Sequence, residues 1–366
     1  MKYWIGYVLA AIFAVATVAA QRFAEAHRVL VDMVYPYISR LIQTTFAQIS
    51  NQVPFALWQT LLLGLVAIGL AFIVLTIVFR KSMIRTVGWI LACASFVTFL
   101  NVGVFGLNKF AGNLSDDIRL NMTKYNIDEL ESAADYYREQ ATELAAQILR
   151  DGNGNADFPE FAELAEMAGN GFKNLTYRDS FPVFAGSTLP VKELIRSSYY
   201  ADKGVSGMTV AITGESSVNP LLPDIYLPFA MCREMAKRMS IGSERDASFA
   251  AFLACRANDD VRFQYTAYLL AFRYCRDALE SFGPGAAEIA LTNQVSKLTS
   301  PMRQDLAAVD SFFRNTEDPE VQGGVVDLLV SWYVQEIYLP EHKEEEVLFD
   351  PMDETQVDLS GNVNAG

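Results

Sequence analysis

The sequence is poor in the groups that most often bind transition metals. Its 366 residues include only two histidines, His27 and His342, and four cysteines, none of them in a Cys-x-x-Cys pair. That pairing is the usual mark of a cysteine zinc site, so such a site is not expected. One cysteine lies in a long apolar run, and the other three lie in apolar helical patterns that predict buried free thiols. In chain order they are Cys93, Cys232, Cys255 and Cys275.

Positive charge is also scarce. The 29 Lys and Arg residues stand against 43 Asp and Glu residues, which gives a net charge of −14 at pH 7. A protein that binds nucleic acid needs a basic face to neutralise phosphates, so no nucleic-acid partner is expected. Part of the negative charge is local, because residues 341–366 hold eight acidic residues and one lysine. This tail lacks periodicity and is predicted to be disordered.

Charge is absent from three long apolar segments, residues 3–20, 58–79 and 87–107. About 20 helical residues cross the hydrocarbon layer of a bilayer. The segments therefore predict a membrane region over residues 1–108, with the lipid bilayer as its partner. The first segment also fits a cleaved signal peptide ending at residues 18–20. We favour an uncleaved span because the run is longer than a usual signal core.

The loops between the spans predict the orientation of the chain. Arg80, Lys81 and Arg85 lie in the short connection between the second and third spans, and a short basic loop is typical of the cytoplasmic side. The rest of the chain after residue 107 is then extracytoplasmic, although the opposite loop, residues 21–57, also carries three arginines. That loop is predicted to be helical up to a break at Tyr35-Pro36.

Residues 109–340 have mostly helical periodicity and form the second predicted domain. Asn126 and Glu129 form a capping-box pattern that predicts the start of a helix. Residues 208–213 alternate and are rich in Thr, Val and Ile, which predicts a small strand element. Further helices are expected from about Pro228 and over residues 245–257, 262–282 and 325–338.

A family resemblance begins at Leu227, with the run LPFAMCREMAKRM, and continues from Gly242 with GSERDASFAAFLAC. Together they resemble the pattern PFxxxHExAHxxGxxxExEANFxAFLAC of domain of unknown function family 3810, which comprises bacterial three-span membrane proteins. The motifs FGLN at residues 105–108, LPVKEL at 189–194 and TGESSVN at 213–219 are similar to other segments of that family.

The resemblance implies a zincin-related, metallopeptidase-like domain. In an HExxH helix, two histidines one turn apart bind zinc and the glutamate activates the zinc-bound water. Here Arg233 and Lys237 hold the histidine positions, and only Glu234 remains. Asp246 aligns with the third ligand of the family, and Ser248 with a neighbouring asparagine. A guanidinium has no lone pair to offer, and a lysine must first lose its proton. The resemblance therefore implies a degenerate site without a metal or another cofactor.

The charges on this helix have two interpretations. They form either a solvated helix face or a buried cluster at the former metal site. We favour the cluster, with Asp246 as the main anionic partner of Arg233 and Lys237, because unpaired buried charge is costly. Glu215 and Ser248 are expected near the adjoining cleft.

The sequence thus favours a mostly α fold of three transmembrane helices followed by an extracytoplasmic pseudo-metallopeptidase domain at residues 109–340. We expect a non-catalytic binding or regulatory module that accepts an extended peptide or protein along residues 208–213 by strand addition. Two alternatives stay open. One is a membrane-bound hydrolase that uses Glu234 with an unrecognised metal or none. The other is a purely structural membrane component.

Overall fold

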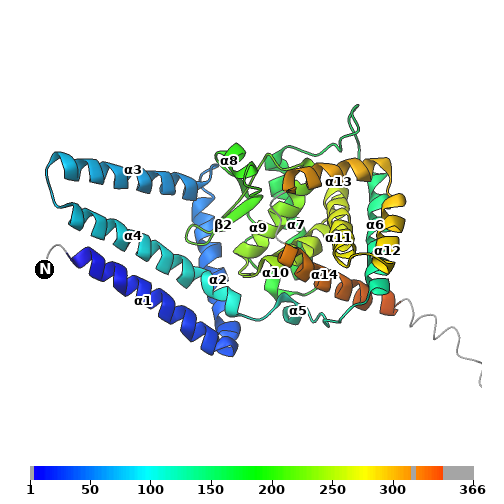
Figure 1. Cartoon of the computed structure of the whole chain (residues 1–366), viewed down its shortest axis with the longest axis horizontal. Helices are drawn as coiled ribbons and strands as arrows, with labels where there is room; N and C mark the ends of the chain where they lie inside the picture. The colour runs from blue at the N-terminus through cyan, green and yellow to red at the C-terminus, as the bar shows by residue number, and fades with distance from the viewer. Residues whose placement is uncertain (1–3, 315–318, 341–366) are drawn as a thin grey trace, which may run out of the picture.

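The computed structural model describes residues 4–314 and 319–340. The predicted disordered tail, residues 341–366, lies outside the described residues. Within them the chain is mostly helical, as predicted, with an elongated group of helices at the N-terminal end and a broad helical domain beyond it (Figure 1).

Among the described residues, three helices are long and apolar enough to cross a membrane, which confirms the predicted spans. They are α1 (Ile5–Ala26), α3 (Leu57–Val78) and α4 (Met83–Val104). Helix α1 packs along α4 and approaches it most closely at Gly6, where an added Cβ would lie 2.4 Å from the carbonyl carbon of Gly88. Small residues at such a crossing let two helices pack tightly in lipid, where no hydrophobic force drives them together.

Helix α2 (Arg28–Ser50) lies across the ends of the three spans (Figure 1). The predicted break at Tyr35-Pro36 is wrong, because the helix continues through Pro36. Contacts on both sides of the proline hold the helix in place. The Tyr35 hydroxyl donates to the carbonyls of Val102 and Gly103 at 3.1 and 3.0 Å, and the Ser39 hydroxyl donates to that of Val104 at 2.6 Å. Local propensity was therefore overridden by tertiary contacts that the sequence does not display.

The helical domain surrounds α9 (Leu227–Arg238), α10 (Glu244–Arg256) and α11 (Val261–Ser281), close to the predicted helices. The Asn126–Glu129 capping box is present at the start of α6 and is confirmed. The surrounding helices and short turns are α5 (Leu114–Asp117), α6 (Ile127–Ala145), α7 (Phe161–Tyr177), α8 (Ser197–Ala201), α12 (Ala286–Ser296), α13 (Ser300–Phe313), α14 (Pro319–Tyr333), η1 (Gly106–Phe110), η2 (Pro182–Phe184), η3 (Asp224–Tyr226) and η4 (Val334–Tyr338).

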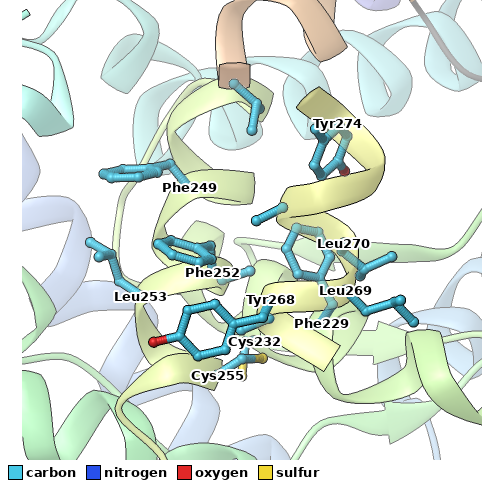
Figure 2. Packing of buried hydrophobic residues seen from close by; sticks show 14 of the residues in the cluster. Phe229, Cys232, Phe249, Phe252, Leu253, Cys255, Tyr268, Leu269, Leu270 and Tyr274 are labelled. Carbon is cyan, nitrogen blue, oxygen red and sulfur yellow. The ribbon is translucent and has the colours of Figure 1, made fainter. Parts of the chain in front are cut away.

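The core of this domain is aromatic and aliphatic. Phe249 and Phe252 stack at 5.9 Å between ring centroids, and Tyr268 meets Phe252 edge to face (Figure 2). Cys232 and Cys255 lie in the same core as free thiols, and Cys275 is also buried and free, as predicted. This packing fixes α9 and α10 against each other.

The sheet has three short strands in the order β1-β3-β2: β1 (Lys192–Glu193), β2 (Gly207–Val210) and β3 (Glu215–Val218). Strand β1 is parallel to β3, and β2 is antiparallel to it. The predicted strand over residues 208–213 is wrong in its second half, since the chain turns after Val210. Gly214 closes that turn with φ +65, and an added Cβ there would lie 2.4 Å from the backbone of α2 at Ala47. Only glycine adopts this conformation readily.

Candidate functional site

Helix α9 lies directly beneath strands β2 and β3, and polar side chains of the sheet bond to it. The hydroxyls of Thr209 and Ser216 both donate to the backbone carbonyl of Glu234, at 2.9 and 2.8 Å. Strand side chains alternate between faces, so Thr209 on β2 and Ser216 opposite it on β3 point to the same side. The sheet is thereby held over the middle of the helix, at the Arg233–Lys237 segment.

Glu234 is completely buried at this contact. Its Oε2 accepts a hydrogen bond from the Thr209 hydroxyl at 2.8 Å, and its Oε1 lies 2.9 Å from Lys237 Nζ. Gly207 closes the site on the strand side, because an added Cβ would approach Glu234 Cγ to 2.6 Å. A side chain of any size at residue 207 would therefore displace the carboxylate.

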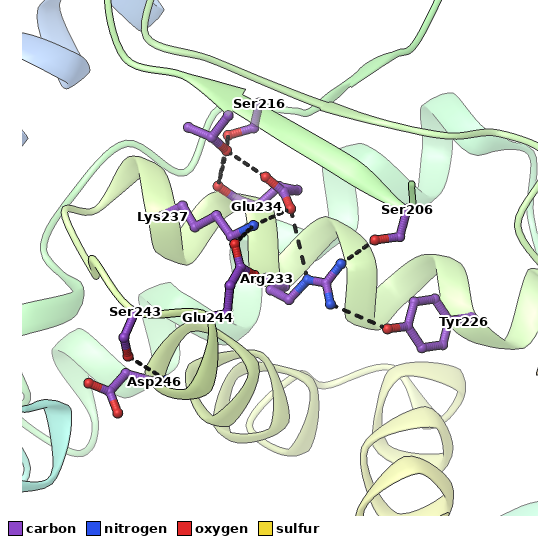
Figure 3. Close-up of polar contacts among 10 residues, drawn as sticks. Ser206, Ser216, Tyr226, Arg233, Glu234, Lys237, Ser243, Glu244 and Asp246 are labelled. Atoms are coloured by element: carbon purple, nitrogen blue, oxygen red, sulfur yellow. Dashed lines mark hydrogen bonds and ion pairs between the residues drawn. The ribbon is translucent and has the colours of Figure 1, made fainter. Parts of the chain in front are cut away.

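Lys237 bridges two carboxylates, one from each of two helices. Its Nζ lies 2.9 Å from Glu234 Oε1 in α9 and 2.7 Å from Glu244 Oε1 at the start of α10 (Figure 3). Arg233 extends the cluster on the other side, with Nε 3.8 Å from Glu234 Oε1 and the guanidinium bonded to Ser206 and the Tyr226 hydroxyl. We call Arg233, Glu234, Lys237 and Glu244 the ion cluster.

The ion cluster contains two cations and two carboxylates and is electrically balanced. Burial opposes the charge of Arg233, yet Tyr226 and the two glutamates outweigh it and raise the pKa of its guanidinium. Burial also works against ionised Glu244, but Lys237 and Arg233 prevail and hold the pKa of its carboxyl below the usual value. Arg233 and Glu244 are therefore charged near neutral pH. Lys237 lies between carboxylates from two helices.

The residues available for metal ligation are few. Within residues 4–314 and 319–340, no three His, Cys, Asp or Glu side chains are placed to hold one ion. The carboxylates of Glu234 and Glu244 already bind the Lys237 ammonium. Residues 233 and 237, one turn apart on α9, are both cationic side chains. A protonated guanidinium or ammonium offers no lone pair to a metal.

Asp246 does not join the cluster, so its predicted pairing with Lys237 is wrong. Its carboxylate accepts from Arg245 Nε at 2.9 Å and from the backbone N–H of Leu114 at 3.3 Å. Residues two apart point to different sides of a helix. Glu244 therefore faces Lys237 while Asp246 turns away. Sequence analysis missed Glu244, although the family pattern carries a glutamate at that position too.

Asp246 instead lines a separate cavity of about 470 Å³ between α2, α5 and the start of α10. Asp32, Arg40 and Asp117 also line it. Burial and the neighbouring Asp32 raise the pKa of Asp117, and Arg40 opposes this shift. The cavity lies beside α2 and the connection from α9 to α10, and no residue of the ion cluster lines it.

The two residues expected near a cleft are both buried. Ser248 is 1 % exposed within α10, and Glu215 is 2 % exposed in β3. The Glu215 carboxylate caps the start of α3, accepting from the backbone N–H groups of Leu57 and Trp58 at 2.9 and 2.8 Å. It also pairs with Lys192 Nζ at 2.6 Å. Both side chains are enclosed by the protein, and Glu215 connects the sheet to a membrane span.

Lys192 completes this connection. Its Nζ donates to the carbonyl of Ser50 at the end of α2, at 2.7 Å. The Lys192–Glu215 pair thus places a positive charge at the C-terminus of α2 and a negative charge at the N-terminus of α3. Both placements match the dipoles of those helices.

Comparison with known proteins places the chain in one family. The family model described as Protein of unknown function (DUF3810) matches residues 31–333, which include most of α2, the second and third spans and nearly all of the described helical domain. Neither the curated proteins nor the solved structures contain a match to the chain. The chain is a membrane-anchored helical protein that belongs to the DUF3810 family.

Proposed function

We propose that this protein is a pseudo-metallopeptidase that binds an extended peptide without cleaving it. The observation that carries the proposal is the ion cluster: Lys237 joins α9 to α10 through Glu234 and Glu244, as a metal ion joins helices through carboxylates. In an HExxH helix the glutamate must reach a metal-bound water. Here Glu234 is fully buried and paired, which argues against a hydrolase that uses it.

The free edge of β2 supplies a place for the peptide. Hydrogen-bonded and non-bonded pairs alternate along an antiparallel ladder. The N–H of Asn219 donates to Ser206, so the bonded pairs continue at Met208 and Val210. The backbone groups of Gly207 and Thr209 then face away from β3. Among the described residues, no other segment bonds to them.

This edge lies directly beside the ion cluster. Gly207 and Thr209 are the residues of β2 that touch Glu234. An added strand would therefore run past the former catalytic position, as substrates do along the edge strand of metallopeptidases that this helix resembles. Main-chain bonds give such binding affinity with little sequence preference.

The domain boundaries and orientation form part of the proposal. We assign residues 1–108 to the membrane region and 109–340 to the pseudo-metallopeptidase domain. The basic connection between α3 and α4, with Arg80, Lys81 and Arg85, supports a cytoplasmic position for that loop. The domain lies at the other end of the spans and is then extracytoplasmic (Figure 1).

A pair of substitutions at one residue tests peptide binding. Thr209→Pro removes the outward N–H and the hydroxyl, whereas Thr209→Val removes only the hydroxyl. Proline is tolerated on an edge strand where its nitrogen faces outward. The probe is fluorescein-labelled unfolded casein, added to the full chain in detergent and followed by anisotropy and gel electrophoresis.

We expect saturable binding without cleavage, retained in Thr209→Val and weakened about tenfold or more in Thr209→Pro, since about 1.4 kcal/mol corresponds to tenfold. Absence of binding by the parent chain, or equal affinities of the two variants, would overturn the peptide-binding proposal. Cleavage of casein would favour the hydrolase.

A further inference from the structure

Helix α2 is the long helix of the membrane region that does not qualify as a span. It has 23 residues, yet the three candidate spans are α1, α3 and α4. It runs crosswise to them at the end nearest the helical domain (Figure 1). Its axis therefore does not follow the direction of the three candidate spans.

Two faces of α2 are covered by the protein. Tyr35 and Ser39, four residues apart, bond to the last carbonyls of α4. On the second face, Arg40 Nε donates to the Met239 carbonyl at 3.1 Å and Gln43 Nε2 lies 3.3 Å from the Ser240 hydroxyl. These faces join α2 to the spans on one side and to the end of α9 on the other.

The third face is exposed and mainly apolar. Val34, Ile38, Leu41 and Ile49 follow a spacing of four, three and eight residues, which aligns them on one side of a helix. Their exposed fractions are 43, 50, 68 and 62 %. Leu30 extends the same surface, with 50 % exposed. We call this set the α2 stripe.

The second half of the stripe belongs to a long uncharged segment of the chain. No charged residue occurs between Leu41 and Phe79, a stretch that includes the second half of α2 and all of α3. Arg40, the last charge before it, turns toward the helical domain, where its NH1 also donates to the Pro182 carbonyl at 3.0 Å. The uncharged surface of α2 is therefore continuous in sequence with the lipid-facing surface of α3.

We propose that α2 is an in-plane membrane helix whose stripe lies in the lipid headgroup and acyl boundary of the leaflet on the side of the helical domain. An apolar face of this kind is typical of helices that lie about 5–10 Å into that boundary. The bilayer is the occupant because the stripe continues the apolar surface of the spans at their ends. A second protein on the stripe would have to lie at the same membrane depth as the lipid that surrounds the spans.

This position would connect the membrane surface to the ion cluster. Arg40 and Gln43 hold Met239 and Ser240, the residues that immediately follow α9. The connection from α9 to α10 separates Lys237 from Glu244. The depth of α2 in the leaflet therefore fixes one side of the cluster without contributing a residue to it.

Spin labels test the stripe in nanodiscs. Single cysteines replace Ile38 and Leu41 in the full chain carrying Cys93→Ser, which removes the exposed native thiol. Leu149→Cys is the matched control, because Leu149 is a leucine of the helical domain with 76 % of its side chain exposed. Collision rates are measured with oxygen, which concentrates in lipid, and with a water-soluble nickel complex.

We expect labels at residues 38 and 41 to collide several-fold more with oxygen than with nickel, and the label at residue 149 to show the reverse. Nickel-dominated collisions at residues 38 and 41 would overturn the proposal. Shielding from both reagents would also overturn it, since a protein partner would then cover the stripe. Neither result bears on peptide binding at β2, which is measured separately.

Discussion

Replacing Lys237 by methionine should destabilise the helical domain strongly. The change keeps the length of the side chain but removes the ammonium that lies 2.9 Å from the wholly buried Glu234 carboxylate. Removing one partner of a buried ion pair costs about 3–5 kcal/mol, against about 0–1 kcal/mol for an exposed pair. Arg233 Nε remains 3.8 Å from the same oxygen, so we expect the lower end, about 3 kcal/mol.

Three further variants locate the source of this loss. Glu244→Gln should cost about 1 kcal/mol or less, because 53 % of its side chain is exposed. Glu234→Gln combined with Lys237→Met should cost less than the sum of the two changes by about 1–3 kcal/mol, since the residues share one interaction. Asp246→Asn should add independently to Lys237→Met, because Asp246 pairs with Arg245.

The assay is reversible guanidinium unfolding of the full chain in detergent. Trp332 is buried in the helical domain and packs against Phe252, whereas the other tryptophans lie in or next to the spans. Its fluorescence in a background with Trp4, Trp58 and Trp89 replaced by phenylalanine therefore reports on that domain. A loss below about 0.5 kcal/mol for Lys237→Met would identify the residue as part of a solvated surface.

Three other outcomes are expected from the same assay. Lys192→Met should lower stability by about 3 kcal/mol, because it leaves the buried Glu215 carboxylate without its cation; Lys203→Met is the exposed control. Gly171→Ala should lower stability by about 1–3 kcal/mol or more, since an added Cβ would lie 1.9 Å from the Ala254 carbonyl oxygen. A neutral result would contradict the close contact of α7 with α10. The lowered pKa of Glu244 should contribute stability above its unfolded value near 4.5 that is lost as pH falls through the folded value; Glu244→Gln should flatten that acid limb.

The sequence predicted the fold well wherever a local pattern of residues determines the structure. Uncharged length identified the three spans, and the capping box at Asn126 identified the start of α6. It failed where distant contacts decide. Pro36 stays helical because hydroxyls of α2 bond to α4, and the strand after Met208 ends early because Gly214 must pass close to α2.

The site was predicted in part. Motif spacing predicted Arg233 and Lys237 on one helix, and both lie in α9, but it chose Asp246 over Glu244 as the anionic partner. Both are acidic residues in the first turn of α10, but they face different sides of the helix and therefore pair with different cations. The capping role of Glu215 at α3 depends on a contact between residues 157 and 158 positions apart. No local sequence pattern predicts a contact over that separation.

The zinc content of the purified full chain tests most directly the proposal that this site is a degenerate metal site. The chain is incubated with zinc, desalted and analysed for metal, beside the variant Arg233→His with Lys237→His, which restores two imidazoles one turn apart next to Glu244. Zinc sites usually take three protein ligands and a water. We predict zinc well below stoichiometric in the parent chain, because two cations hold the ligand positions, and a clear gain in the variant. About one zinc per parent chain, removed by a chelator, would contradict the replacement of the metal by Lys237 and Arg233.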